Sequence, residues 1–308
     1  MRWDDFRRSD NVEDSRGDEG GGFGGGGGMG IPIGGGGLGI GTVIIIGLIG
    51  WALGIDPSIL IGGAEIVNSG KHHEQPYQPP ARQTTGKPGD QMGDFVAAVL
   101  GNTEDTWKEI FAKSGQQYSV PRLRLYSGAI QGGCGFAQAA MGPFYCPNDR
   151  RIYLDTSFFR DIQARFRGCS GKACEFAEAY VIAHEVGHHV QNLLGILPKV
   201  QSAQRSAGSK VEANRIQVRV ELQADCLAGV WANHAVDTGY LQPLTEADIA
   251  QGLDAAAAVG DDRIQKQTQG RVNPETWTHG SSAQRQAWFL NGYRGGNLGN
   301  CDTFSGAI

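Results

Sequence analysis

The sequence predicts an α+β protein, in which a mostly helical domain with a small β-sheet follows a Gly-rich N-terminus and an apolar segment. Three observations lead to this fold class. Apolar residues recur at helical spacing through much of residues 91–308, two short stretches alternate as half-buried strands do, and a long uncharged run precedes them. With 308 residues, the chain can bury one sizeable core or two modest ones. A net charge of −5 without a basic block argues against a nucleic-acid partner.

The N-terminal segment, residues 1–37, is predicted to be disordered. Residues 1–19 are dense in charge and poor in aliphatic side chains, and residues 20–41 are mostly glycine. Neither stretch can bury enough apolar surface to offset the conformational entropy lost on folding.

Residues 38–55, "LGIGTVIIIGLIGWALGI", are predicted to form a transmembrane helix. They carry no charge, and the uncharged run extends upstream to Ile31, so it is long enough to cross a bilayer as a helix. A buried core helix is the alternative. Gly50 and Gly54 form a GxxxG pair, a pattern that can seat two helices against each other. A homodimer through this span is therefore a further expectation.

Two patterns predict the side of the membrane on which the domain lies. Four arginines precede the span and Lys71 is the first basic residue after it, which favours a cytoplasmic N-terminus. All six cysteines follow the span, as expected in an oxidising compartment. The domain is thus expected outside the cytoplasm, on the periplasmic or extracellular side. Close spacing favours the disulfides Cys134–Cys146 and Cys169–Cys174, which leaves Cys226–Cys301.

Residues 56–90 are rich in proline and polar residues and are predicted to be a linker, so that the folded domain covers residues 91–308. Its N-terminal part is expected to hold two short helices joined near Gly101–Asn102, followed by strands in "PRLRLYSG" and at Arg151–Asp155. Residues 198–209 are predicted to be a loop. Helices are expected in "TSFFRDIQARF", from Cys174 to Leu194, over Lys210–Ala235, from Thr245 to Gln267, and after "THGSS".

The motif "HEVGH" at residues 184–188 predicts a metal site. His184 and His188 are four residues apart on a predicted helix, so they share one face and can bind one Zn²⁺, with Glu185 beside them as a proton acceptor. The alternative is a solvated helix face that carries histidines. The segment around the motif is apolar, however, and burying these groups without a partner is costly. His189 points off the metal direction and is expected to back the site or to lie on the surface.

A catalytic zinc site needs a third protein ligand, and "ELQAD" at residues 221–225 is the favoured source. Glu221 and Asp225 are also four apart on one helical face. Glu221 is expected to reach the metal, and Asp225 to accept a hydrogen bond from the far nitrogen of a ligand histidine. The alternative is a like-charge pair on a surface helix. Other downstream candidates for the third ligand are Glu212, His234, Glu246 and His279.

These motifs resemble the gluzincin arrangement, HExxH followed by ExxxD on a second helix. The whole chain is similar to the neutral zinc metallopeptidases of bacteria, which are single-pass membrane proteins. The similarity is most specific in "RIYLDTSFF", "AYVIAHEVGHHVQ", "ELQADCLAGVWA" and "THGSSAQR". It implies a zincin-like fold, zinc on His184, His188 and Glu221, Glu185 as the catalytic general base, and Asp225 behind His184.

The stretch "THGSSAQRQ" also resembles a segment of membrane-linked gluzincins. That resemblance implies that His279 faces the zinc cleft and stabilises an oxyanion, while Arg285 helps to hold the start of a helix. Gly280 stands where that family has proline, and His279 before a helix capped by Ser281 or Ser282 is the alternative. In zincins a substrate pairs with a sheet edge above the active helix, and Arg151–Asp155 is the candidate strand.

The function predicted from these observations is a membrane-anchored, zinc-dependent metallopeptidase that acts on a peptide or protein substrate. Zinc would activate water, and Glu185 would take up and return the proton. The alternative function is a non-catalytic, membrane-tethered binding module with a structural zinc, for which Cys226 or His234 would supply a fourth ligand. A zinc hydrolase acting on a cell-wall amide is a weaker third reading.

Overall fold

The computed structural model describes residues 3–17, 88–138, 142–160, 172–241, 278–306 and 308, with isolated positions between 244 and 253. The predicted span at 38–55, nearly all of the linker at 56–90 and most of the predicted helix at 245–267 lie outside these residues. No helix within the described ranges is both long and apolar enough to cross a membrane.

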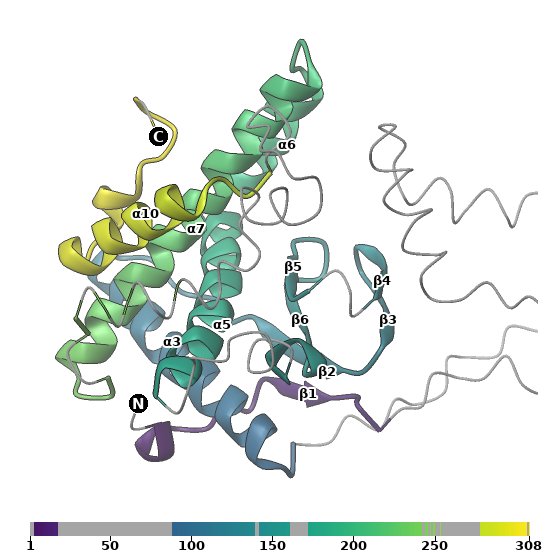
Figure 1. Ribbon diagram of the computed structural model, residues 1–308, viewed down its shortest axis with the longest axis vertical. Helices are drawn as coiled ribbons and strands as arrows, with labels where there is room; N and C mark the ends of the chain where they lie inside the picture. Colours follow the sequence, from purple (N-terminus) through teal and green to yellow (C-terminus); the bar gives the residue numbers. More distant parts are fainter. Residues whose placement is uncertain are drawn as a thin grey trace, which may run out of the picture. The chain divides into compact units, whose positions relative to one another are not determined.

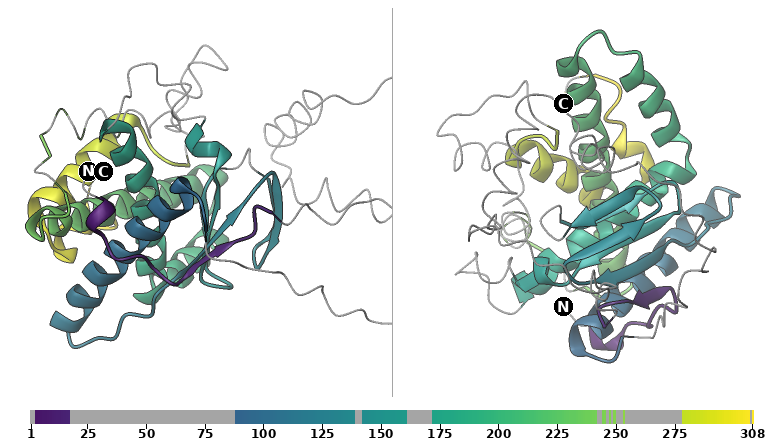
Figure 2. Two further views of the ribbon diagram at one scale, coloured as in Figure 1. Left: turned by 90° about the horizontal axis from the view of Figure 1, so that it is seen from below. Right: turned by 90° about the vertical axis from the view of Figure 1, so that its right-hand side faces the viewer.

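The predicted α+β class is confirmed, with helices dominating and two small sheets beside them. The larger sheet has the order β1 (Val12–Asp14), β2 (Arg122–Tyr126), β6 (Arg151–Asp155), β5 (Phe144–Cys146). The first three strands run parallel, whereas β5 is antiparallel to β6 and forms one edge of the sheet, with β1 at the other (Figure 2). Strands β3 (Ala129–Gly132) and β4 (Gly135–Gln138) form a separate hairpin. Both predicted strands are present, at β2 and β6.

The long helices lie next to one another in Figure 1, and buried apolar side chains from them form the main core. Because side chains alternate along a strand, Leu123 and Leu125 of β2 and their neighbours Ile152 and Leu154 of β6 all face this core. The described helices are α3 (Gln91–Lys113), α5 (Lys172–Leu193), α6 (Ile196–Arg205), α7 (Lys210–Asp237) and α10 (Ser282–Gly295), with 3-10 turns η1 (Trp3–Asp5) and η5 (Leu298–Cys301).

Helix α3 is continuous, so the prediction of two short helices joined near Gly101–Asn102 is wrong. Gly101 does not end a helix. A Cβ at this position would lie 2.3 Å from the Arg7 carbonyl oxygen, so the glycine allows another chain segment to pass close to the helix.

The predicted loop at 198–209 is also wrong, because residues 196–205 form α6. Pro198 lies in the first turn of this helix, where a backbone N–H has no intrahelical partner and proline is tolerated. Helices α5, α7 and α10 agree with the prediction, and α10 begins with a capping box between Ser281 and Gln284. Residues 157–160 begin the helix expected in "TSFFRDIQARF", and 161–171 lie outside the described residues.

The N-terminal segment contradicts the prediction of disorder over residues 3–17. It forms η1 and β1, and β1 pairs with β2 in register Val12↔Leu123. Phe6 and Val12 are buried. The composition of residues 1–19 did not predict this order, because ion pairs contribute to holding the segment and the prediction of disorder considered only the burial of apolar surface.

The predicted disulfides Cys134–Cys146 and Cys226–Cys301 are both formed. Cys174 is disulfide-bonded too, and Cys169, its predicted partner, lies outside the described residues. The second bridge ties the residue after Asp225 in α7 to the C-terminal turn η5.

Candidate metal centre

Two helices cross closely at the HExxH motif. Gly187 lies between the two motif histidines on α5, and a Cβ there would be 2.9 Å from the carbonyl oxygen of Ala224 on α7. The missing side chain therefore lets the backbones of α5 and α7 approach at the positions of both motifs. This close approach brings the carboxylates of α7 to the histidines of α5.

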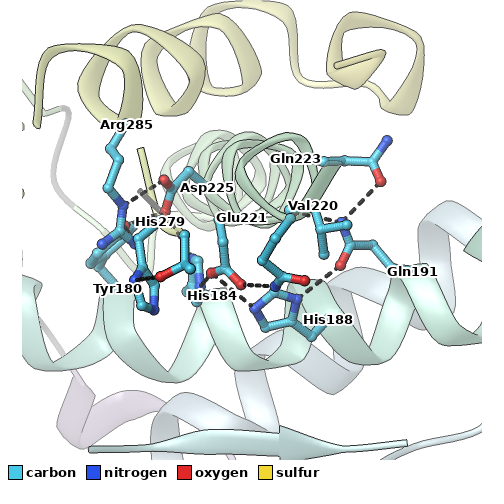
Figure 3. Close-up of polar contacts among 12 residues, drawn as sticks. Tyr180, His184, His188, Gln191, Val220, Glu221, Gln223, Asp225, His279 and Arg285 are labelled. Atoms are coloured by element: carbon cyan, nitrogen blue, oxygen red, sulfur yellow. Dashed lines mark hydrogen bonds and ion pairs between the residues drawn. The ribbon is translucent and has the colours of Figure 1, made fainter. Parts of the chain in front are cut away.

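The structure brings together three predicted ligands, His184, His188 and Glu221 (Figure 3). The Nε2 atoms of His184 and His188 lie 3.2 and 3.5 Å from Oε2 of Glu221. One potential ligand atom from each residue lies within 4.8 Å of the others. The second oxygen of Glu221, Oε1, accepts a hydrogen bond of 2.7 Å from Gln217, which leaves Oε2 directed at the histidines.

The hydrogen bonds behind the histidines fit a zinc ion. Nδ1 of His184 is 2.8 Å from Oδ1 of Asp225, and Nδ1 of His188 is 2.9 Å from Oε1 of Gln191. Because both partners are acceptors, each Nδ1 carries the proton of the neutral ring, and each Nε2 keeps its lone pair. Two such nitrogens and one carboxylate oxygen are the donor set of a catalytic zinc site.

A buried charge network lies behind His184. Asp225 is fully buried and receives Nε and Nη2 of Arg285 at 2.8 and 2.9 Å, as well as the hydroxyl of Tyr180. Burial lowers the pKa of His184, but the Asp225 carboxylate outweighs it, so that the pKa rises to about 10. Burial raises the pKa of Asp225, and Arg285 and His184 reverse this to about 2. Asp225 is therefore a buried carboxylate, and the surface-pair alternative is wrong.

A chain of neutral amides lies behind His188. Gln191 donates to the carbonyl oxygen of Val220 at 2.8 Å and to Oε1 of Gln223 at 2.9 Å. Gln223 in turn donates to the carbonyl oxygen of Cys301 at 2.8 Å. Gln191 and Gln223 are both buried. The chain connects His188 to the C-terminal turn that the Cys226–Cys301 disulfide holds.

Glu185 lines the same cavity, and one of its carboxylate oxygens accepts no hydrogen bond from the described residues. Its Oε2 is buried and has no hydrogen-bond partner among the described residues. Burial raises the pKa of this carboxyl group above its usual value. Because a buried acceptor without a partner is costly, Oε2 is suited to a ligand that the protein itself does not supply.

The cavity has a volume of about 410 Å³ and is lined by the three candidate ligands and by Glu185. His279 and Arg285 also line it, and so do Phe144 and Tyr145 of β5. His279 is exposed, and the backbone after it departs from the resembling family, since Gly280 has φ +87°, which proline cannot adopt. Arg285 does more than hold a helix start, because its guanidinium reaches Asp225.

His189 lies away from the metal ligands. It is fully buried, so the surface alternative is wrong. Its Nε2 donates to the carbonyl oxygen of Ser119 at 2.6 Å, and Nδ1 accepts from Tyr145 of β5 at 3.0 Å. His189 therefore holds the edge strand against α5. Strand β6, predicted as the substrate-pairing edge, is paired on both sides by β2 and β5, so it has no free edge for a substrate. Strand β5 is an end strand of the sheet.

The two proposed fourth ligands are engaged elsewhere. Cys226 is in a disulfide, and Nε2 of His234 bonds the carbonyl oxygen of Gly296. The described residues contain one cluster that could hold a metal, and it has three members. A site with three protein ligands is typical of catalytic zinc, while structural sites usually have four.

Sequence reasoning missed Tyr180, Gln191 and Gln223. Gln191 lies three residues after His188 on α5, and Tyr180 lies four before His184, so helical spacing could have placed both on the metal-facing side. Gln223 gives no such signal, because its partner arrives from the distant C-terminal turn.

Three comparisons with known proteins bear on this site. The chain matches, over residues 1–304, the family described as "Putative neutral zinc metallopeptidase". The "Uncharacterized protein YpfJ" of Escherichia coli (strain K12) is 43% identical over 308 residues, all of both chains. The "Uncharacterized protein Rv2575" of Mycobacterium tuberculosis is 47% identical over 264 residues, 83% of this chain and 85% of that protein. No solved structure matches the chain.

Proposed function

Because the chain belongs to the neutral zinc metallopeptidase family, we propose that it is a zinc-dependent peptidase with a zincin-like fold and a membrane anchor. One observation carries the catalytic part of the proposal. Two histidine nitrogens and a carboxylate oxygen meet within 4.8 Å, next to a buried Glu185 oxygen that has no partner among the described residues.

His184, His188 and Glu221 would hold the ion. Zinc, when bound, supplies a Lewis acid that activates water and polarises a carbonyl group. Glu185 accepts the proton of the attacking water on its free oxygen and delivers it to the leaving amine. Asp225 fixes the ring of His184, and Gln191 fixes that of His188. His279, which lines the same cavity, is the candidate donor to the developing oxyanion.

An extended peptide is the substrate class that the cavity favours. Phe144 and Tyr145 belong to β5, which pairs only with β6 among the described strands, and both residues line the cavity. A peptide backbone that paired with the free edge of β5 would pass over the HExxH helix. His189 and the Cys134–Cys146 disulfide hold this edge strand in place.

The anchoring part of the proposal is supported by the sequence of residues 31–55, which carries no charge and is long enough to enter a bilayer. The formed disulfides support an oxidising compartment for the domain, outside the cytoplasm.

The test of catalysis uses the full chain in detergent micelles and a diverse peptide library. We expect cleavage that stops with a chelator and returns with zinc. Glu185→Gln should keep bound zinc, measured by elemental analysis, and lose at least about 100-fold in kcat, because it removes the proton acceptor. Glu109→Gln, the same change at an exposed position of α3, is the matched control. Cleavage that survives chelator would exclude zinc catalysis, and a Glu185→Gln variant as fast as wild type would exclude Glu185 as the base.

A further inference from the structure

The N-terminal segment is built into the same folded unit as the metal centre. The backbone N–H of Ser9 donates to the carbonyl oxygen of Ala97 on α3 at 2.9 Å. Gly101 of α3 has no side chain where the Arg7 carbonyl passes. Trp3 packs edge-on against Phe95 with ring centroids 5.5 Å apart. The segment therefore lies along α3, and α3 has a glycine shaped to accept it.

The segment also completes the sheet. Leu123 of β2 donates its N–H to Asn11 at 2.9 Å, and Ser15 donates to Leu125 at 2.9 Å. Glu13 of β1 receives Arg122 of β2 at 3.1 Å and Arg151 of β6 at 3.4 Å. Val12 contributes its side chain to the main core.

Three arginines of this segment form ion pairs with carboxylates of the domain. Arg7 bonds Glu104 at 2.6 Å, Arg8 bonds Asp94 at 2.7 Å, and Arg16 bonds Asp90 at 2.8 Å. Three of the four arginines that suggested a cytoplasmic N-terminus thus have carboxylate partners on or just before α3. Their positive charge is explained by folding, so it no longer indicates membrane orientation.

We propose that residues 3–17 and the zinc domain lie on the same side of the membrane. This rests on the membrane anchoring proposed above. A single crossing within residues 18–87 would put β1 and β2 on opposite sides of about 30 Å of hydrocarbon, and the observed pairing could not form. Exchange of β1 between copies does not relieve this, because every copy would have the same orientation.

The length of the chain between residues 17 and 88 allows both of its ends to lie on one side of the membrane. The segment has about 70 residues, and one crossing takes about 20 as a helix.

The first test places one epitope tag before Met1 and another after Ile308 of the full chain. Right-side-out and inside-out membrane vesicles from a bacterial host are treated with protease. We expect both tags to be lost together in right-side-out vesicles and both to be kept in inside-out ones. Loss of one tag in each preparation would overturn the proposal. Loss of both only in inside-out vesicles would support it, while contradicting the oxidising compartment.

Alkaline carbonate washing of the same vesicles separates this proposal from the anchoring on which it rests. The chain should stay with the membrane. Its release would overturn insertion, and the same-side proposal with it, whereas retained protein with tags on opposite sides would overturn the same-side placement alone. Neither result alters the zinc site.

The second test asks whether the substitution Gly101→Ala raises or lowers the Tm. Replacing glycine by alanine inside a helix is normally stabilising. If residues 3–17 are docked, Gly101→Ala instead pushes against the Arg7 backbone, and the Tm of the full chain in micelles should fall by several degrees. If residues 3–17 are not docked on α3, the Tm should rise, which would remove the contact on which the proposal rests and so overturn it.

A charge exchange gives the matched control for docking. Arg8→Glu should lower the Tm, and adding Asp94→Arg should recover most of the loss, because the ion pair is restored in reverse. In the vesicle assay Arg8→Glu should leave both tags on their original side. A change in the position of the N-terminal tag would instead show that Arg8 acts on membrane orientation, and would contradict the proposal.

Discussion

The two histidines of the metal centre are held from behind by different chemistry. His184 bonds a carboxylate that is itself clamped by Arg285 and Tyr180, so its partner is charged and fully buried. His188 bonds the neutral amide of Gln191, which ends in backbone carbonyls. Both partners fix the same tautomer, yet only the first changes the basicity of its ring strongly. Asp225 therefore sets both the orientation and the basicity of the His184 ring, whereas Gln191 sets only the orientation of the His188 ring.

The difference has a structural origin. The carboxylate behind His184 can be buried only because α10 brings a cation to it. Gly229 of α7 and Gly292 of α10 let the two helices meet, since a Cβ at Gly292 would lie 1.9 Å from the Cys226 carbonyl oxygen. On the His188 side none of the described residues brings a cation to Gln191, and a neutral amide is the acceptor that can be buried there at low cost.

The largest effect should follow from breaking the charged side. Asp225→Asn leaves Arg285 as a buried cation without its counter-charge, so we expect a loss of about 3–5 kcal/mol in the free energy of unfolding. Zinc affinity, measured by competition with a chelating dye, should fall about 10–100-fold because His184 loses its charged partner.

A double variant separates the two consequences. In Asp225→Asn with Arg285→Leu, no uncompensated charge remains, and stability should return to within about 1–2 kcal/mol of the wild type. Zinc affinity should stay low. Recovery of both quantities would mean that Asp225 acts on zinc only through the stability of the fold.

A smaller effect is expected on the neutral side. Gln191→Leu leaves Nδ1 of His188 without its acceptor and removes the side-chain bond to the Val220 carbonyl, which should cost about 1–3 kcal/mol in unfolding free energy. Zinc affinity should fall about 10-fold, at the lower end of the range for such partners. Gln223→Leu, one step further from the metal, serves as the control and should affect zinc less. An equal loss from both variants would contradict the proposed order of the amide chain.

The smallest effect concerns His189, which directly follows the HExxH motif. Burial lowers the pKa of His189 to about 4, below the value near 6.5 of an unfolded histidine. Between these values the unfolded state binds more protons, so this group's contribution to stability is complete above pH 6.5 and decreases as the pH falls towards 4.

In His189→Phe that pH-dependent contribution is absent. The Tm difference between wild type and variant, measured in chelator by calorimetry, should therefore narrow as the pH falls from 6.5 to 4. Metal release and the titration of His184 and His188 occur in both proteins and cancel in this difference. If the Tm difference between wild type and His189→Phe stayed constant from pH 6.5 to 4, His189 would not be kept neutral by its buried position.

Sequence reasoning reached furthest where one helix carries the information. The HExxH motif places its residues by helical spacing, and the second pair, Glu221 and Asp225, follows the same rule on α7. It failed where a local signal had a tertiary cause. Gly101 resembles a helix break and is a contact point, and Pro198 resembles a loop and begins α6. The composition of the charged N-terminus predicts disorder. Its arginines nevertheless bind carboxylates about 90 residues away in the sequence, and these contacts hold the segment in place.

The sequence by itself determined helices α5, α7 and α10, the two motifs, the two disulfide pairs within the described residues and the family. These follow from spacing and residue type, which are local or are carried by short patterns. Only the tertiary structure decided that α7 presents its carboxylates to α5, that β5 is the free edge, and that residues 3–17 belong to the domain. Each of these depends on distant backbones approaching one another, and such contacts leave no periodic trace in a single chain.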